Sequence, residues 1–236
     1  MIKVQEPAMT IVEHLDELRL RIIRCLIFTG LVCAAMLFVS KKIVAALELP
    51  AVGIHFQALS LEEPLLVYFK VAFYSGLVIS LPYILWEASR FVLPGLKPTE
   101  RRILLPIVAG GPILFACGAA FAYFLVLPPM LHFLGCFGKD ISPINQRLDY
   151  YVSLVTTIML YMGLCFQLPI ILFALSFTGL VDSAGLLRVW KYAVFGASVV
   201  AAIITPDPTA FSMLIVFAAL SSLYFVSIGL LKAFKR

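Results

Sequence analysis

Six long apolar runs, each bounded by short polar segments, divide this chain. They cover residues about 22–40, 65–86, 103–131, 151–177, 192–205 and 209–231. A helix needs about 20 mostly apolar residues to cross the hydrocarbon core of a bilayer. The pattern therefore predicts an all-α polytopic membrane protein with six transmembrane helices in a single transmembrane domain, residues 1–236. The fifth run is short, which is consistent with local thinning of the bilayer.

Polar residues mark where several helices begin. Thr10 and Glu13 are spaced as in a capping box, and apolar residues then recur on one helix face. This predicts an amphipathic helix over about 10–21 that leads into the first span. Ser60 to Pro64 stands before the second span and Asp149 before the fourth, where we expect them to cap the helix N-termini.

Prolines interrupt several of the predicted spans. They are Pro82, Pro106, Pro112, Pro128, Pro129 and Pro169. An interior proline removes a helix hydrogen bond and tends to kink the helix, which favours a concave, cupped arrangement over a straight bundle. Prolines are also commoner in membrane helices than in soluble ones, so the residues alone leave both explanations open.

Composition and charge support the membrane class and give an orientation. The chain is 62% hydrophobic with a mean hydropathy of +1.04, well above the roughly 45–50% apolar content of soluble domains. The net charge is +5, but the basic residues are scattered at run ends and form no stripe for nucleic acid. With the N-terminus inside, thirteen Lys and Arg face the cytoplasm and four face outward. The positive-inside rule then predicts that both termini are cytoplasmic.

Familiar catalytic and metal-binding patterns are absent from the sequence. The three histidines lie far apart, and the five cysteines have no metal-ligand spacing. There is no phosphate-binding loop and no complete serine-nucleophile motif. We therefore expect no enzyme, no metal and no cofactor. The first apolar run ends at two lysines and further spans follow, so we expect it to remain in place as a span.

Lys70 and Gln167 are the polar residues inside the predicted spans that call for an explanation. Burying Lys70 costs about 2.5–3.5 kcal/mol on insertion scales, so it indicates a functional site or a polar partner. Its place near the outer end instead favours an ammonium that extends to the interface. Gln167 either satisfies backbone groups freed by Pro169 or contacts a partner helix. Together they suggest an alternative function, a small solute transporter or channel; a structural scaffold is a third.

Two charged segments stand at the predicted cytoplasmic face. Residues 14–21 read HLDELRLR before the first span, and residues 91–102 read FVLPGLKPTERR before the third. Glu17 and Arg21 are i,i+4 neighbours, so salt pairs on a solvated helix face explain them most simply. Two carboxylates at one face also suit a basic ligand, since a guanidinium donates two parallel N–H bonds to a carboxylate and lysine does not.

These segments resemble the TatC family of the twin-arginine protein translocase over essentially the whole chain. The resemblance rests on five features in order. They are the HLxELRxR motif at 14–21, Glu63-Pro64 with Lys70, the FxxPGLxxxER motif at 91–101, the FAYF segment at 121–124 with Pro128, and the TPDP turn at 205–208. Each motif is weak alone, but their order and their placement at the matching membrane faces make the joint signal specific.

The resemblance implies a receptor for signal peptides with two consecutive arginines. It implies the core component of a system that exports folded proteins across the cytoplasmic (inner) membrane with energy from the proton-motive force. The implied signal-peptide-binding residues are Glu17, Glu100, Arg19, Arg21, Phe91 and Arg101, with the two glutamates binding the arginine pair. Structural roles are implied for Pro50, Glu63, Pro64 and Lys70. The implied partners are the single-span proteins TatA and TatB, further copies of the receptor, and the lipid bilayer.

The chain departs from the family pattern at polar positions within the later spans. Gln167 stands where relatives commonly carry a glutamate, and Met213 where a glutamine is common. Phe225 replaces another frequent glutamate. The resemblance implies partner contacts at Gln167, Met213 and Asp207. Because a glutamine cannot carry charge, these departures bear on partner docking and proton-linked roles, and leave the recognition motifs unchanged.

Overall fold

The computed structural model describes residues 11–49, 55–58, 60–92, 109–138, 145–177, 181–205 and 210–234. The helices among them are α1 (Ile11–Met36), α2 (Ser40–Glu48), α3 (Glu63–Val92), α5 (Gly111–Phe121), the π-helical turn η2 (Ala122–Val126), α6 (Leu127–Gly138), α7 (Leu148–Cys165), α8 (Leu168–Phe177), α9 (Ser183–Arg188), α10 (Trp190–Ile204) and α11 (Ala210–Phe234). Two short strands, β1 (His55–Gln57) and β2 (Asn145–Arg147), pair in parallel. The fold is thus helical as predicted, with a small ribbon that the apolar pattern did not predict.

Four helical segments are long and apolar enough to cross a membrane. They are Glu63–Ala88, Gly111–Phe133, Leu148–Ser176 and Phe211–Ala233, and they overlap the predicted second, third, fourth and sixth spans. α1 and α2 meet the same criterion only as a pair bent by 75°. α10 has 15 residues, so it rises about 22 Å and is shorter than the roughly 30 Å hydrocarbon core. The predicted shortness of the fifth run is confirmed.

The first span differs from its predicted limits. α1 is continuous from Ile11 to Met36, so the helix expected at 10–21 and the span expected from residue 22 form one rod. This rod ends before residue 40 because the N–H groups of residues 37–39 bond carbonyls only three residues earlier. α2 then leaves at an angle and buries Val44 and Leu47. Neither glycine nor proline marks this bend, so the sequence pattern did not reveal it.

Some of the predicted proline kinks appear as breaks and others do not, and Pro106 lies outside the described residues. α7 and α8 are separated at Phe166–Gln167, just before Pro169. The wider turn Ala122–Val126 precedes Pro128, whose ring would clash with the carbonyl four residues earlier in a regular helix. Pro82, in contrast, lies inside the uninterrupted α3. Proline therefore reshapes the third and fourth predicted spans more than the second.

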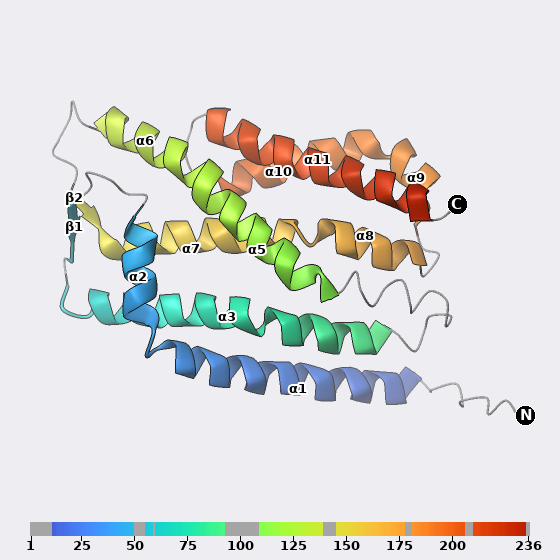
Figure 1. Cartoon of the computed structure of the whole chain (residues 1–236), viewed down its shortest axis with the longest axis horizontal. Helices are drawn as coiled ribbons and strands as arrows, with labels where there is room; N and C mark the ends of the chain where they lie inside the picture. The colour runs from blue at the N-terminus through green and yellow to red at the C-terminus, as the bar shows by residue number, and fades with distance from the viewer. Residues whose placement is uncertain are drawn as a thin grey trace, which may run out of the picture.

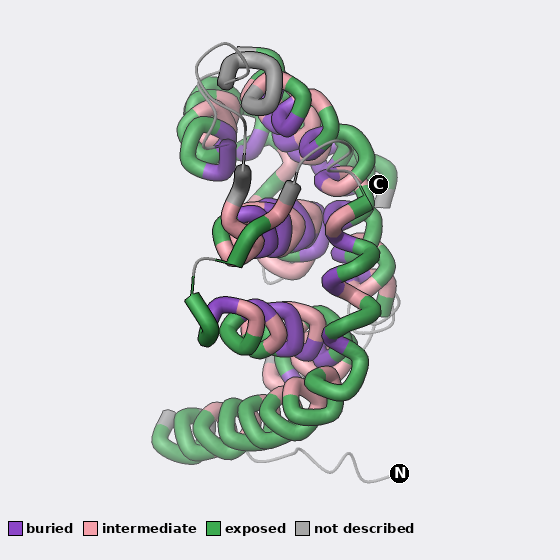
Figure 2. The backbone as a smooth tube through the Cα atoms, turned by 90° about the vertical axis from the view of Figure 1, so that its left-hand side faces the viewer, coloured by how far each residue is buried: buried purple, intermediate pink, exposed green. Residues whose placement is uncertain are grey.

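The helices pack side by side in a row. α1 packs against α3, α3 against α7, and α8 against α11. α5, η2 and α6 form one rod that crosses this row diagonally, and α2 crosses α3 towards α7 (Figure 1). The start of α1 and the end of α11 lie at the same end of the bundle (Figure 1). Seen from the side the stack is bowed (Figure 2), in agreement with the expected curved shape.

Glycines allow a close helix approach between α5 and α7. A Cβ atom on Gly118 would lie 2.7 Å from the carbonyl oxygen of Met162, and one on Gly163 would lie 2.5 Å from the ring of Phe115. Only glycine fits at either position without a shift of the neighbour. The main buried cluster is built around α7 and includes Tyr151, which is fully buried.

The outward faces of the described helices carry large exposed apolar side chains. Leu31 is 68% exposed, Phe195 70% and Phe211 64%. An apolar surface this extensive is unsuited to water, and it fits a protein whose outer solvent is lipid.

Candidate functional site

An ion-pair cluster joins the first part of α1 to the last part of α3. The Arg21 Nη1 donates to Glu87 Oε2 at 2.8 Å, and its Nε donates to Glu17 Oε1 at 3.1 Å. Nη2 also contacts Glu17 Oε1. The side chains of Arg21, Glu17 and Glu87 are 13%, 24% and 5% exposed. Arg21 is therefore a largely buried cation held between two carboxylates from different helices.

Helix geometry explains how this cluster is assembled. Glu17 and Arg21 are four residues apart on α1 and so share a face. Packing of α3 along α1 brings Glu87 to that face, and the Tyr83 hydroxyl, one turn earlier, donates to Glu87 Oε1 at 3.2 Å. The Tyr83 ring packs on Phe28 of α1 with centroids 4.4 Å apart. Ring packing and polar bonding thus fix the same helix pair.

Glu87 was not identified from the sequence. The predicted second span ended at residue 86, which left Glu87 among the polar residues that follow an apolar run. A carboxylate within the last turns of a membrane helix is costly unless it is paired, and this was the signal available. The expected helix-face pair of Glu17 and Arg21 is confirmed, but it forms only part of a larger cluster that reaches α3.

The other residues predicted for signal binding are placed as follows. Arg19 is exposed on α1. Phe91 is half-buried at the end of α3, one turn after Glu87. Glu100 and Arg101 lie outside the described residues, as do Asp207 and Pro50.

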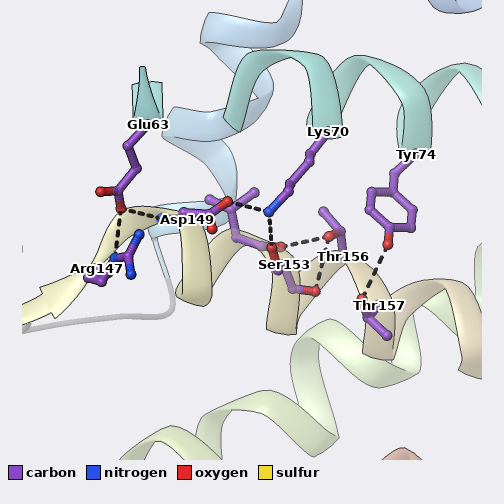
Figure 3. A network of polar contacts seen from close by, with 9 residues as sticks. Glu63, Lys70, Tyr74, Arg147, Asp149, Ser153, Thr156 and Thr157 are labelled. Carbon is purple, nitrogen blue, oxygen red and sulfur yellow. Dashed lines mark hydrogen bonds and ion pairs between the residues drawn. The ribbon is translucent and has the colours of Figure 1, made fainter. Parts of the chain in front are cut away.

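A second polar network links the opposite end of α3 to α7 (Figure 3). Glu63 is 2% exposed and its Oε1 accepts the backbone N–H of Asp149 at 3.2 Å. The Arg147 Nε lies 3.6 Å from the same oxygen. Arg147 occupies the N-cap position of α7 without a capping side-chain bond. Glu63 therefore caps α7 from another helix, where Asp149 was expected to cap it.

Lys70 belongs to this same network. Its Nζ contacts Asp149 Oδ1 and donates to the hydroxyl of Ser153 at 3.0 Å (Figure 3). One turn further along α3, the hydroxyls of Tyr74 and Thr157 lie 3.4 Å apart. The polar partner that the sequence offered as one interpretation of Lys70 is therefore present, since Asp149 and Ser153 lie on α7. The other interpretation, an ammonium that extends to the interface, stays a prediction. Pro64 follows Glu63 in the first turn of α3, where a proline is tolerated.

Two tyrosine hydroxyls hold the end of α2. Tyr151 of α7 donates to the carbonyl of Leu47 at 2.6 Å, and Tyr123 of η2 donates to the carbonyl of Ala46 at 2.7 Å. The Ala46 carbonyl also accepts the backbone N–H of Leu49 at 3.4 Å. The last carbonyls of a helix lack regular partners within it, so the buried bond from Tyr151 supplies the Leu47 carbonyl with a donor. Tyr123 belongs to the FAYF segment, so one role of that segment is structural: it holds the end of α2.

Gln167 joins the break between α7 and α8 to the start of α5. It is 6% exposed, and its Nε2 donates to the carbonyl of Gly111 at 2.8 Å. It thus bonds backbone of a neighbouring helix in this chain. Met213 is half-buried against the main cluster, and Phe225 is 44% exposed and stacks near Trp190. Gln167 and Met213 therefore help pack this chain itself.

An apolar cavity of about 250 Å³ lies among α1, α2, α3, α5 and α7. Val71, Tyr74, Phe115 and Met159 are among the residues that line it. Within the described residues, no group of three or more His, Cys, Asp or Glu is arranged to hold a metal ion. The described residues therefore offer a ligand ion pairing near the helix ends and apolar contact in the cavity between the helices.

Apolar helices, a lipid-suited surface and ion-pair networks near the helix ends define a polytopic helical membrane protein. The family follows from comparison: the chain belongs to the TatC family, since the model described as "Sec-independent protein translocase protein (TatC)" matches residues 13–218. The resemblance inferred from the motifs is thereby confirmed. Members of this family are components of a protein translocase, so this chain is a component of a protein-transport system.

Individual relatives match over most of their length. The Sec-independent protein translocase protein TatC of Synechocystis sp. is 40% identical over 223 residues, which cover 94% of this chain and 87% of the relative. The corresponding protein of Deinococcus radiodurans is 35% identical, and the match covers 94% of this chain and 86% of that relative. A crystal structure of the twin-arginine translocase receptor TatC aligns with a TM-score of 0.81 and 33% identity, covering 95% of this chain and all of that one.

Proposed function

We propose that this protein is the signal-peptide receptor and core component of a twin-arginine translocation system. It spans the cytoplasmic (inner) membrane six times with both termini in the cytoplasm, and it takes part in export of folded proteins driven by the proton-motive force. Membership of the TatC family and the likeness to a solved TatC receptor support this. The start of α1 and the end of α11 lie at one end of the bundle (Figure 1), as an even number of spans requires.

In this proposal Glu17 and Glu100 bind the two arginines of the signal. Arg19, Arg21, Phe91 and Arg101 border that site. The observation that carries the proposal is the setting of Glu17, a carboxylate only 24% exposed beside a second, buried carboxylate. Exposed ion pairs contribute about 0–1 kcal/mol each, whereas partial burial strengthens a charge-assisted pair.

Arginine pairing alone does not account for useful affinity. Micromolar binding corresponds to about 8 kcal/mol, more than two partly solvated pairs contribute. The apolar stretch of the signal supplies the remainder by contact with the spans, and the cavity lined by Val71 and Phe115 is apolar surface of the suitable kind. The arginines then provide discrimination between signals and the apolar stretch provides much of the affinity.

The proposed partners are TatA and TatB, each with a single span, and further copies of this receptor within the bilayer. Gln167, Met213 and Asp207 are the proposed partner contacts, although Nε2 of Gln167 already donates to the Gly111 carbonyl within the chain. We assign no catalytic residue. The alternative of a solute transporter loses support because Lys70 and Gln167 bond separate partners, Asp149 and Gly111, and share no network.

Site-specific crosslinking of a twin-arginine signal peptide tests this proposal. Glu17→Ala and Glu100→Ala should each reduce crosslinking, and replacing the twin arginines of the probe by lysines should do the same. Glu62→Ala, at an exposed acid before α3, is the matched control and should leave crosslinking unchanged. Arginine-dependent binding that persists in both variants would overturn the assignment of the two glutamates.

A further inference from the structure

Arg21 divides one guanidinium between two carboxylates. We propose that Glu87 is a positioning residue for recognition of the signal's arginines: by holding Arg21 from α3, it keeps Glu17 from being fully neutralised by its own helix neighbour. This inference rests on the proposed function, in which Glu17 binds an incoming arginine. Glu87 itself is 5% exposed and bonds both Arg21 and Tyr83, so it acts through Arg21 without touching the signal.

The charges of the cluster carry the argument. Glu17, Arg21 and Glu87 together bear one net negative charge at neutral pH. Without Glu87, the remaining pair of Glu17 and Arg21 would be neutral, so these side chains would attract an incoming cation less than the three-residue cluster does. The other charged residues on this stretch of α1 are exposed, and water screens them; they are Glu13, Asp16, Arg19 and Arg24.

Burial makes this one charge effective. Two opposite charges attract several-fold more strongly in a partly buried site than in bulk water, because the effective dielectric constant is lower there. Arg21 and Glu87 are 13% and 5% exposed, so their mutual attraction belongs to the partly buried case. Arg21 is therefore held firmly by Glu87, and an arginine that approaches Glu17 from outside meets less competition.

The geometry of Arg21 agrees with a shared guanidinium. Nε and Nη2 both contact Oε1 of Glu17, while Nη1 is directed to Glu87. An arginine bound by a single carboxylate prefers two parallel bonds to its two oxygens. The bonds of Arg21 to Glu17 instead converge on one oxygen. Arg21 thus contacts Glu17 through one carboxylate oxygen while its Nη1 is bound to Glu87.

Binding of a fluorescent twin-arginine signal peptide to the full chain in lipid nanodiscs tests the inference. Glu87→Gln retains an oxygen that accepts from Arg21 but removes the charge. It should weaken binding at least about tenfold and reduce the dependence of the association rate on salt. A twin-lysine peptide should lose less affinity than the twin-arginine one. Glu63→Gln, at the buried acid of the opposite network, is the matched control and should change neither quantity.

A double variant separates charge from structural support. Arg21→Gln alone is the reference for the double variant Arg21→Gln with Glu87→Gln. Because Glu87 acts through Arg21, adding Glu87→Gln to Arg21→Gln should weaken binding by only a few-fold. An additional loss of tenfold or more overturns the inference, and so does a folded Glu87→Gln variant with wild-type affinity and salt dependence. If the Glu17→Ala variant binds the twin-arginine peptide as tightly as the wild type does, or if the wild type binds the twin-lysine peptide equally well, the proposed function itself is wrong. These results differ from those that overturn only the role of Glu87, so the two failures are distinguishable.

Discussion

The buried carboxylate of Glu63, at the start of α3, accepts the backbone N–H of Asp149 in the first turn of α7 at 3.2 Å. A helix N-terminus has unpaired N–H groups and a partial positive charge, and here a neighbouring helix supplies the compensating anion. Arg147, 3.6 Å from the same carboxylate oxygen, balances the charge of Glu63. The relationship ties two spans together where the β1–β2 ribbon also joins them.

Glu63→Ala should therefore destabilise the protein more than Glu63→Gln. Alanine removes the acceptor of the Asp149 N–H and leaves Arg147 without its counter-ion, at a cost of about 1–3 kcal/mol. Glutamine keeps an oxygen acceptor at the same place and loses only the charge. Thermal unfolding of the detergent-purified variants measures the difference. Equal midpoints for the two variants would contradict the capping role.

Lys70 and Asp149 should behave as a coupled pair. Lys70→Met leaves the Asp149 carboxylate without its cation, and Asp149→Asn leaves the ammonium of Lys70 without its anion. The double variant removes both charges, so its loss of stability should be smaller than the sum of the two single losses, by about 1 kcal/mol for a partly exposed pair. A double-mutant cycle of unfolding free energies provides the test, and strict additivity would argue against direct coupling.

Tyr151→Phe should loosen the docking of α2. The substitution removes only the hydroxyl that donates to the carbonyl of Leu47 at 2.6 Å, and an unpaired buried carbonyl costs about 1–3 kcal/mol. Tyr161→Phe is the matched control because Tyr161 is exposed on the same helix. Limited proteolysis between α2 and α3 reports on α2 directly. Cleavage should be faster in the Tyr151 variant and unchanged in the control.

Gly118→Ala should separate α5 from α7. The added methyl would lie 2.7 Å from the carbonyl oxygen of Met162, and relieving such an overlap typically costs about 1–3 kcal/mol. Gly196→Ala on α10 is the control, since a Cβ there meets nothing within 4 Å. Alanine also favours helix by up to about 1 kcal/mol over glycine. The control should thus have an unchanged or slightly higher midpoint of thermal unfolding, opposite in sign to Gly118→Ala.

Gln167→Glu should have two opposing effects. An ionised carboxylate cannot donate to the carbonyl of Gly111, so the α5–α8 contact weakens and the unfolding midpoint falls. If a carboxylate here matters to partner helices, the same substitution should strengthen or alter crosslinking to TatA or TatB. Gln167→Met removes the donor without adding charge and serves as the control. An identical crosslinking pattern in all three proteins would exclude a role of this position in partner contact.

Much of the architecture could be predicted because the length of an apolar run and the position of a proline act on the helix that contains them. The long apolar runs predicted the four long spans and the short α10, and Pro169 predicted the break at Phe166–Gln167. The bend before α2 escaped prediction because neither glycine nor proline marks it. The docking of the far end of α2 escaped prediction too, because Tyr151 and Tyr123 bind it from distant parts of the chain.

The candidate site divides in the same way. The pair of Glu17 and Arg21 follows from helix periodicity and was expected. Glu87 reaches them across 66 residues, and its partner depends on how α1 and α3 pack, which no local pattern specifies. The partners of Lys70 could not be specified for the same reason, since Asp149 and Ser153 become its neighbours only when α3 and α7 associate.

The tyrosine bonds at the end of α2 also bear on biogenesis. Leu47 receives its hydrogen bond from a residue 104 positions later, and Ala46 from one 77 positions later. A ribosome that synthesises the chain from its N-terminus therefore delivers α2 to the membrane well before either hydroxyl exists. The Ala46 carbonyl has the N–H of Leu49 as a local donor, but until α7 is inserted the Leu47 carbonyl has to rely on interfacial water or lipid headgroups. The end of α2 therefore acquires its last hydrogen bond only after the middle of the protein has been made.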